Sequence, residues 1–309
     1  MRKHIVVVGS INLDLVAAGE RVPLPGETLT GRTFSTFHGG KGANQAVGVA
    51  RLGHPVSMVG KVGDDSFGSA LKGALRKAGV DVKGVGAVKG SSGVALINTG
   101  DDGQNNIVVV PGANGKLLPK DITKTSSLLR KAEMFLTQLE IPLITMETLA
   151  VFAHKNKIPL MLDPAPAREL PKGLLQCTTW ITPNESETRM LCGLSADEPM
   201  SPETAARCAA WLLEQGPKNV VIKMGAQGVF LATSGGTREM IPAFTVKAVD
   251  STAAGDAFNA GFAVSLLSGA APVQAARYAS AVAAISVTRV GAQPSMPTAR
   301  DVERFLKSQ

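Results

Sequence analysis

Apolar residues recur along the chain at two spacings, and each spacing predicts a different kind of element. Short β-branched runs at 4–9 and 56–62 are typical of buried strands. Residues 66–77 place apolar side chains three and four positions apart, and Gly79 follows, so we expect a helix that ends there. The first part of the chain therefore alternates strands with helices.

From residue 121 onward this alternation becomes regular. The expected helices are 121–131, 143–155, 185–192 and 202–214, and the expected strands are 134–139, 159–162, 178–182 and 219–223. Such an order predicts an α/β fold with an open, mostly parallel sheet and helices on both faces. Polar residues follow the carboxyl ends of these strands, where open α/β sheets bind their ligands.

Three further strand patterns are more exposed and fall outside the alternation. Residues 27–37 alternate threonine and serine with other residues, and 94–98 and 105–110 flank a Gly-Asp-Asp-Gly turn as the arms of a hairpin do. Three or more strands with an apolar face can stand as a separate sheet. We therefore expect one domain over 1–309 with a small β-sheet, built from about 15–37 and 93–111, that serves as a lid, a dimer surface or both.

Composition narrows the functional classes. The net charge is +7, but lysine and arginine are scattered without a basic run, which favours an anionic substrate over nucleic acid. The cysteines Cys177, Cys192 and Cys208 have neither metal nor redox spacing, as in a reducing compartment. No apolar run reaches the length of a membrane span, and Asn12 and Asp14 interrupt the first apolar run. We expect a soluble, cytoplasmic protein without nucleic-acid or membrane partners.

The stretch 250–259, D-S-T-A-A-G-D-A-F-N, carries the strongest chemical signal. Ala253, Ala254 and Gly255 have little bulk and lead into a helix. The start of a helix has unpaired backbone N–H groups and a positive dipole end, so these residues can form an anion hole. Asp256 at its mouth can take a proton while the N–H groups hold the charge of a phosphoryl group in transfer. Taken alone, Asp256 is equally well explained as an acid that stabilises the helix dipole.

Two other stretches offer polar groups to a ligand. Asn12 and Asp14 lie among apolar neighbours, where an acid either grips a polar ligand or faces solvent from an alternating strand. The run G-G-K-G-A-N-Q-A at 39–46 leads into a predicted helix and offers Lys41 and Asn44. It is not a phosphate-binding P-loop, because the G-K-[ST] ending is absent.

Six motifs follow one another along the chain. They are G-S-I-N-L-D at 9–14, G-G-K-G-A-N-Q-A at 39–46, D-P-A-P-A-R-E-L at 163–170, T-P-N-E-S-E at 182–187, D-S-T-A-A-G-D-A-F-N at 250–259 and T-R-V-G-A-Q-P-S at 288–295. Together and in this order they resemble the ribokinase family of carbohydrate and nucleoside kinases, over nearly the whole chain. The resemblance implies ATP-dependent phosphorylation of D-ribose at O5 to D-ribose 5-phosphate, with Mg²⁺ and a monovalent cation, normally K⁺.

The resemblance also implies roles for individual positions. Asp256 would be the catalytic base, with Ala253, Ala254 and Gly255 as the anion hole. The residues implied to hold ribose are Asn12, Asp14, Gly39, Gly40, Lys41, Gly42, Asn44, Glu140 and Asp256. Those implied to bind ATP are Asn184, Glu187, Lys223, Gly225, Gln227, Gly228, Gly255 and Ser280, with Glu187 acting on Mg²⁺ through water. Those implied to bind K⁺, several through backbone carbonyls, are Asp250, Thr252, Ser286, Arg289, Gly291 and Ser295.

Two positions depart from the family pattern. Lys223 stands where threonine is common, so it would either reach a phosphate or point away from the nucleotide. Ser280 stands where histidine or asparagine is common near the adenine, which leaves the nucleotide preference open. Members of the family often dimerise through the lid, so a homodimer follows by analogy.

Rival interpretations remain beside this one. Glu187 could be an ordinary acid in the first turn of a helix, and Glu140 a solvated loop residue. Within the family, the substrate could be another sugar or a nucleoside, such as deoxyribose, fructose or adenosine. An oxidoreductase that binds a dinucleotide is disfavoured, because no G-x-G-x-x-G follows the first strand. A catalytically silent sugar binder is disfavoured by the intact Asp256 and its small neighbours.

Overall fold

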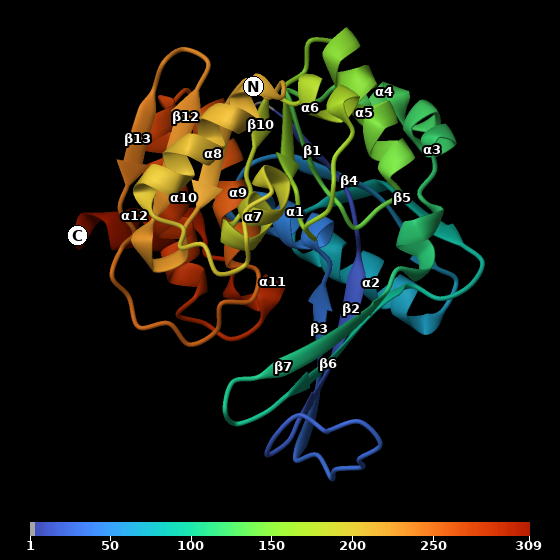
Figure 1. Cartoon of the computed structure of the whole chain (residues 1–309). Helices are drawn as coiled ribbons and strands as arrows, with labels where there is room; N and C mark the ends of the chain where they lie inside the picture. The colour runs from blue at the N-terminus through green and yellow to red at the C-terminus, as the bar shows by residue number, and fades with distance from the viewer. Residues whose placement is uncertain (1–3) are drawn as a thin grey trace.

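A large twisted sheet runs through the body of the molecule (Figure 1). The computed structural model describes residues 4–309. Within them the strand order of this sheet is β13-β12-β11-β10-β9-β8-β1-β4-β5, and β12 alone runs opposite to the other strands. The strands are β1 (Ile5–Val8), β4 (Val56–Gly63), β5 (Asp81–Val88), β8 (Met134–Gln138), β9 (Leu160–Asp163), β10 (Trp180–Ile181), β11 (Asn219–Lys223), β12 (Val229–Thr233) and β13 (Arg238–Ile241). The expected α/β fold is confirmed.

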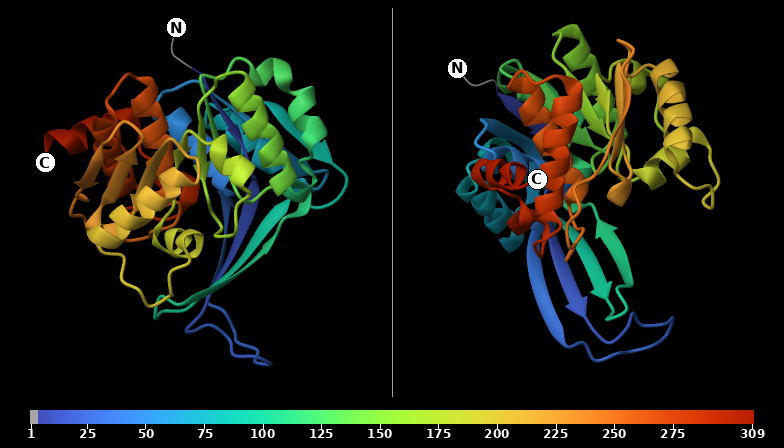
Figure 2. Two further views of the ribbon diagram at one scale, coloured as in Figure 1. Left: turned by 45° about the horizontal axis from the view of Figure 1, so that its top comes forward. Right: turned by 90° about the vertical axis from the view of Figure 1, so that its left-hand side faces the viewer.

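Helices cover both faces of this sheet, and each face has its own apolar core (Figures 1 and 2). One core is formed with α1 (Lys41–Arg51), α2 (Ser66–Lys77), α9 (Ala254–Leu267), α10 (Pro272–Ser286) and α12 (Ala299–Lys307). The other is formed with α3 (Pro119–Lys124), α4 (Ser126–Leu129), α5 (Leu143–Lys155), α6 (Lys172–Gln176), α7 (Glu185–Cys192) and α8 (Pro202–Glu214). In β1, Ile5 and Val7 face the first core while Val6 and Val8 face the second, which explains a continuously apolar strand.

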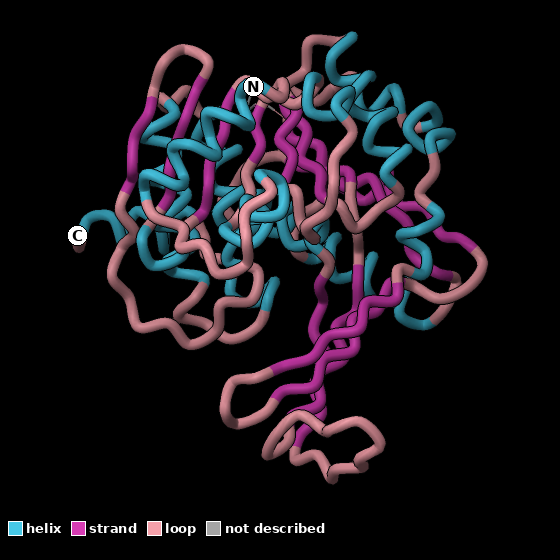
Figure 3. The backbone as a smooth tube through the Cα atoms, viewed as in Figure 1, coloured by secondary structure: helices cyan, strands magenta, loops and turns pink. Residues whose placement is uncertain are grey.

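A second, four-stranded sheet projects from the body (Figures 2 and 3). Its order is β3-β2-β6-β7, with β2 (Asn12–Ala18), β3 (Thr33–Gly39), β6 (Gly93–Thr99) and β7 (Asn105–Val110). β2 and β6 run parallel from their first residues, where Asn12 pairs with Gly93. All six residues of β7 are exposed. The expected small sheet is therefore present, with its base at the strand starts that face the large sheet.

Several boundaries differ from the sequence prediction. The strand expected at 27–37 begins only at Thr33, because the chain turns at Leu24–Glu27 and Arg21 pairs with Glu27 there. The helix expected at 121–131 breaks into α3 and α4 at Thr125, whose hydroxyl donates to the Asp121 carbonyl. The strand expected at 178–182 shortens to β10. The strand β5 was not expected, because its valines stand three residues apart between glycines, which matches neither the alternation of a strand nor the spacing of an amphipathic helix.

The remaining short elements complete the chain. They are the 3₁₀ turns η1 (Gly112–Lys116) and η2 (Gly225–Gln227) and the short helix α11 (Ala292–Ser295), which lies within the motif at 288–295. Across residues 4–309 no helix is both long enough and apolar enough to cross a bilayer.

Candidate active site

The polar cluster of interest lies where the order of the large sheet reverses. The chain places β4 and β5 on one side of β1 and then returns to place β8 to β11 on the other. Such a reversal leaves a crevice beyond the carboxyl ends of the strands, which is the usual ligand site of open α/β sheets. The residues that follow β1, β8 and β9 meet there with the first turns of α1 and α9.

Asp256 lies in the first turn of α9, buried to 4% exposure. Asn44 Nδ2 donates to its Oδ2 at 3.0 Å, and Gln45 Nε2 donates to its Oδ1 at 3.0 Å. Burial is the main cause that raises the pKa of Asp256 to about 6, while the Lys41 ammonium acts against this and the Asp163 carboxylate adds to it. The carboxylate is thus held in place by two amides and poised near neutral pH.

The start of α9 leaves backbone donors free beside this carboxylate. Ala253 is the residue before the helix, with φ of 60°, and its side chain gives no cap. The Ala254 N–H donates to the Ser251 carbonyl at 3.2 Å. The backbone N–H groups of Gly255 and Asp256 have no hydrogen-bond acceptor among residues 4–309. These two N–H groups are therefore the donors available to an anion.

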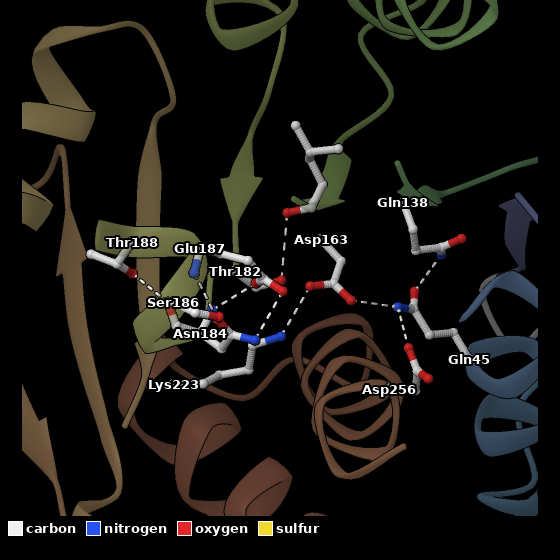
Figure 4. Close-up of polar contacts among 11 residues, drawn as sticks. Gln45, Gln138, Asp163, Thr182, Asn184, Ser186, Glu187, Thr188, Lys223 and Asp256 are labelled. Atoms are coloured by element: carbon white, nitrogen blue, oxygen red, sulfur yellow. Dashed lines mark hydrogen bonds and ion pairs between the residues drawn. The ribbon is translucent and has the colours of Figure 1, made fainter. Parts of the chain in front are cut away.

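A chain of hydrogen bonds links Asp256 to the next strands (Figure 4). Gln45 Nε2, besides its bond to Asp256, donates to Asp163 Oδ2 at 3.1 Å. Gln45 Oε1 accepts from Gln138 Nε2 at 2.6 Å. Asp163 Oδ1 accepts from Lys223 Nζ at 3.0 Å, an ion pair whose side chains are only 12% and 3% exposed.

Lys223 points into the site and not away from it. A Cβ added at Gly255 would lie 3.2 Å from Lys223 Nζ, so the ammonium lies directly beside the free N–H groups of α9. The backbone of Lys223 is held as well, because its N–H donates to the Pro183 carbonyl at 2.8 Å. Lys223 thus places its side-chain nitrogen beside the start of α9.

Asn184 and Glu187 form a capping box at the start of α7. Glu187 Oε2 accepts from the Asn184 N–H at 2.8 Å, and Oε1 accepts from Asn184 Nδ2 at 2.9 Å. Burial is the main cause that raises the pKa of Glu187, with Asp163 adding to it and Lys223 opposing it. Both Glu187 oxygens therefore accept from Asn184, and each keeps a lone pair for a further partner.

The opposite wall of the crevice is the base of the small sheet. Burial, then the charges of Glu140 and Asp256, raise the pKa of Asp14 to about 6. A side chain at Gly39 would collide with the Asp14 carboxylate, and Gly40 has φ of 86°, so both glycines are required by the backbone path. Asn12 Oδ1 accepts from Asn114 Nδ2 at 2.6 Å, which fixes its amide.

Lys41 lies at the centre of the carboxylates. Burial opposes its charge, but the carboxylates of Asp256, Asp163, Glu140 and Glu187 outweigh it and hold the pKa of Lys41 above its usual value. Glu140 Oε2 accepts from the Lys41 N–H at 3.1 Å and from Ser10 Oγ at 2.5 Å. Glu140 is therefore a built part of the crevice and not a solvated loop residue.

Comparison with known proteins agrees with this geometry. The family model described as "pfkB family carbohydrate kinase" matches residues 2–299. The chain belongs to the pfkB family of carbohydrate kinases. It is 40% identical to the ribokinase of Haemophilus influenzae over 309 residues, covering 99% of each chain, and 42% identical to that of Bacillus subtilis, covering 98% of this chain and 99% of the relative. A structure of Arabidopsis thaliana ribokinase complexed with ribose and ATP superimposes with a TM-score of 0.91 at 34% identity, over 99% of both chains.

The segment expected to bind the nucleotide is the turn η2, which follows β11. Gly225 has φ of 52° and Gly228 has φ of 108°, and a side chain at Gly228 would strike the Ile241 carbonyl. Gln227 Nε2 donates to the Met200 carbonyl at 3.3 Å, so its side chain turns toward that carbonyl. Ser280 lies on α10 at 8% exposure, and its Oγ has no partner within residues 4–309.

The segments implied to hold K⁺ converge on Asp250. Its Oδ1 accepts from the Thr252 N–H at 2.9 Å and its Oδ2 from the Gly291 N–H at 2.8 Å. Burial opposes the charge of Asp250, but the Thr252 side chain and these backbone bonds outweigh it and lower the pKa of this carboxyl. Such hard oxygen donors fit an alkali cation.

Three other side chains of that set already have protein partners. Ser286 Oγ and Ser295 Oγ donate to carbonyls of their own turns, those of Ala283 and Ala292. The Arg289 guanidinium pairs with Asp301 at 3.3 Å. Within residues 4–309 no cluster of three or more acidic, histidine or cysteine side chains is arranged to hold a metal by itself.

Sequence reasoning missed five residues that build the kinase site. They are Ser10, Gln45, Asn114, Gln138 and Asp163. A signal was present for Asp163, which ends a strand inside a recognised motif, and for Gln45, which lies within G-G-K-G-A-N-Q-A. No sequence signal marked Gln138 or Asn114, because their roles depend on partners 93 and 102 residues away.

Proposed function

We propose that this kinase transfers the γ-phosphoryl group of ATP to O5 of D-ribose, giving D-ribose 5-phosphate and ADP. The observation that carries the proposal is the placement of a buried carboxylate, Asp256, beside two backbone N–H groups without acceptors at the start of α9. The similarity to ribokinases over the whole chain supports ribose as the sugar.

Asp256 acts as the general base. As the O5–H bond breaks, its proton passes to the carboxylate while O5 forms a bond to the γ-phosphorus and the bond from that phosphorus to the β-bridging oxygen breaks. The N–H groups of Gly255, from the anion hole expected at 253–255, and of the next residue, Asp256, stabilise the charge on the equatorial oxygens. The adjacent Lys223 ammonium adds to this. A pKa of about 6 keeps Asp256 ionised at neutral pH and still basic enough to accept the proton.

Ribose binds between the base of the small sheet and the first turn of α1. Asp14 and Glu140 accept from sugar hydroxyls, since carboxylates form strong hydrogen bonds with such donors. Lys41 and Asn12 add donors, while Gly39, Gly40 and Gly42 allow the sugar to approach the backbone, and Asn44 holds both the sugar and Asp256. The small sheet then closes as a lid and excludes water, which competes with the sugar as phosphoryl acceptor.

Cations complete the nucleotide side. Asn184 and Glu187 would hold Mg²⁺ through water, beside phosphates that Lys223 and the turn Gly225–Gly228 contact, with Ser280 near the adenine. Mg²⁺ would neutralise phosphate charge during transfer. Asp250 and the backbone around Thr252, Ser286, Arg289, Gly291 and Ser295 would hold K⁺, which supplies positive charge near the start of α9.

We also propose a homodimer formed through the small sheet. Ile107, Val108, Val109 and Val110 of β7 are 43–60% exposed on an edge strand, a surface that soluble proteins rarely leave uncovered. Ile107→Lys with Val109→Lys should give monomers by light scattering, whereas Ile144→Lys on α5 should not. A parent protein that is monomeric at micromolar concentration would contradict the dimer. The three cysteines are free thiols, which supports the cytoplasmic location expected from the sequence.

The test of the function is ADP release from Mg-ATP with a panel of sugars, in K⁺ and then in Na⁺. We expect ribose to give the highest kcat/KM, with higher rates in K⁺, and ³¹P NMR to place the phosphate on O5. Asp256→Asn, purified in the same way, controls for contaminating kinases. A higher kcat/KM for deoxyribose, fructose or adenosine would identify that compound as the substrate, with the same mechanism of transfer. No ADP release with any sugar would refute kinase activity and favour a catalytically silent sugar binder.

A further inference from the structure

One side chain, Gln45, contacts two carboxylates of the site at once. It lies in the first half of α1 at 1% exposure, and its Nε2 carries two hydrogens. One is donated to Asp256 Oδ1 at 3.0 Å and the other to Asp163 Oδ2 at 3.1 Å (Figure 4). Both donors of the amide are therefore used, and each goes to a different acid.

The orientation of the Gln45 amide is set by a second glutamine. Gln138 Nε2 donates to Gln45 Oε1 at 2.6 Å, so the oxygen faces Gln138 and the nitrogen must face the carboxylates. A flipped amide would place Oε1 against two anions and Nε2 against another donor. Gly9 leaves the space for Gln138, because a Cβ there would collide with Gln138 Oε1.

We propose that Gln45 is a positioning residue for phosphoryl transfer: it orients the carboxylate of Asp256 and couples it to the Asp163–Lys223 ion pair. Gln45 acts through Asp256, and it is not itself a base or a sugar ligand. The inference rests on the proposed function only for its kinetic consequence, since the contacts themselves are independent of the substrate.

Several charged groups surround Asp256 besides this amide. They come from α1, β2, β9 and β11, and they are Lys41, Asp14, Asp163 and Lys223. Asp14 and Asp163 disfavour ionisation of Asp256, while Lys41 favours it. The Gln45 and Asn44 amides add neutral donors that also favour the ionised form. Removal of Gln45 takes away one of these donors and leaves the two like charges adjacent without the amide between them.

The first test replaces Gln45 by methionine, which has a similar length and no donor. Loss of a hydrogen bond to a carboxylate should raise the pKa on the acidic limb of the kcat profile by about one unit. At pH 6 kcat should fall about fivefold relative to the parent, because a limb that moves from about 6 to about 7 lowers the ionised fraction of Asp256 from about a half to about a tenth. At pH 9 kcat should be within about threefold, because Asp256 is ionised there in both proteins. The KM for ribose should change less than threefold.

Two further variants separate positioning from packing. Gln138→Met should shift the limb in the same direction by a smaller amount, and should have no further effect in the Gln45→Met background, since Gln138 acts through Gln45. Gln215→Met, at the end of α8 and away from the site, is the matched control and should leave the profile unchanged. Thermal unfolding of each variant checks that the fold is intact.

The second readout needs no substrate. With ¹³C-labelled aspartate, NMR titration of the free protein should give a higher pKa for Asp256 in Gln45→Met than in the parent. A folded variant with an unmoved Asp256 pKa and an unmoved acidic limb would refute the inference, because Gln45 would then only fill space. A parent without ribose-dependent ADP release would refute the proposed function alone, since the NMR titration would still decide the role of Gln45.

Discussion

Asp256→Asn should abolish most of the activity and at the same time stabilise the free protein. The substitution keeps the shape of the side chain and removes its basicity. General-base catalysis contributes about 10²–10⁴ in rate, so kcat should fall by about that factor. The affinity for ribose should stay within a few fold, because Asp14, Glu140 and Lys41 still line the crevice.

The structure has room for the new amide. In the parent, Asn44 Nδ2 and Gln45 Nε2 both donate to Asp256, so an asparagine at 256 would place its NH₂ against one donor. Asn44 Oδ1 is buried without a partner within residues 4–309. A flip of the Asn44 amide turns this oxygen toward the new NH₂ group. Asn44 Oδ1 then accepts from the asparagine at 256, in place of the bond that Asn44 Nδ2 donates to Asp256 in the parent.

The stabilisation follows from the raised pKa of Asp256. Because its folded-state pKa of about 6 exceeds the ordinary 3.8, the ionised carboxylate destabilises the fold by about 3 kcal/mol at pH 7. This destabilisation is absent at pH values below about 4, where the group is protonated in both states, and is complete above about pH 6. The neutral variant should therefore melt about 5 °C higher than the parent at pH 7, with the difference vanishing toward pH 4.

The assay is thermal unfolding of both proteins at several pH values between 4 and 8, together with kcat and calorimetric ribose binding. Asp121→Asn is a control of opposite sign: Asp121 pairs with Lys61 at 2.7 Å, which helps to lower its pKa, so that variant should be less stable than the parent at pH 7 and approach it as the pH falls. Near-normal turnover in Asp256→Asn would refute the role of Asp256 as the general base. Equal or lower stability at pH 7 would refute the argument from burial.

Three further predictions address the neighbouring groups. Lys223→Met should destabilise the protein by about 3–5 kcal/mol in denaturant unfolding, because it leaves the buried Asp163 carboxylate unpaired, and should raise the KM for ATP more than that for ribose; an unchanged KM for ATP would place Lys223 outside the nucleotide site. Gly93→Ala should weaken ribose binding about tenfold by calorimetry. Its Cβ would displace the Asn114 amide, which holds the side chain of the proposed sugar ligand Asn12. Asp250→Asn should raise the K⁺ concentration for half-maximal activation about tenfold, and activation identical to the parent would exclude Asp250 from the cation site.

The fold was largely predictable because its strongest signals are local. The buried run at β1 and the helical spacing of α2, α5 and α8 identify those elements from a few residues each. The errors occur where local and tertiary effects compete. At Thr125 a side-chain hydroxyl interrupts a periodic helix, and β5 pairs with β4 through a register shift that no period in the sequence reveals.

The site was predictable to the extent that its residues stand in contiguous motifs. Asp256 and Lys41 each have small residues beside them, which indicates an approach to backbone. What the sequence could not give is the set of pairings between motifs. Gln45 touches Asp163 and Asp256, which lie 118 and 211 residues away, and only the folded sheet brings them together. The same holds for Lys223: the sequence left open whether its side chain points into the site, and the structure shows that it does so to pair with Asp163.

The charge balance of the crevice explains why these pairings are needed. Five carboxylates, those of Asp14, Glu140, Asp163, Glu187 and Asp256, face two ammonium groups. A site of this sign would repel ATP if its charges were evenly spread. The carboxylates of Asp14 and Glu140 instead line the proposed sugar side, while the Lys223 ammonium and the free N–H groups lie where the phosphoryl group would pass. Burial, with a smaller contribution from the Asp163 carboxylate, raises the pKa of Asp256. A base of ordinary acidity would accept the proton of a hydroxyl far less readily. The burial of Asp256, which destabilises the fold at neutral pH, is therefore the feature that makes it an effective base.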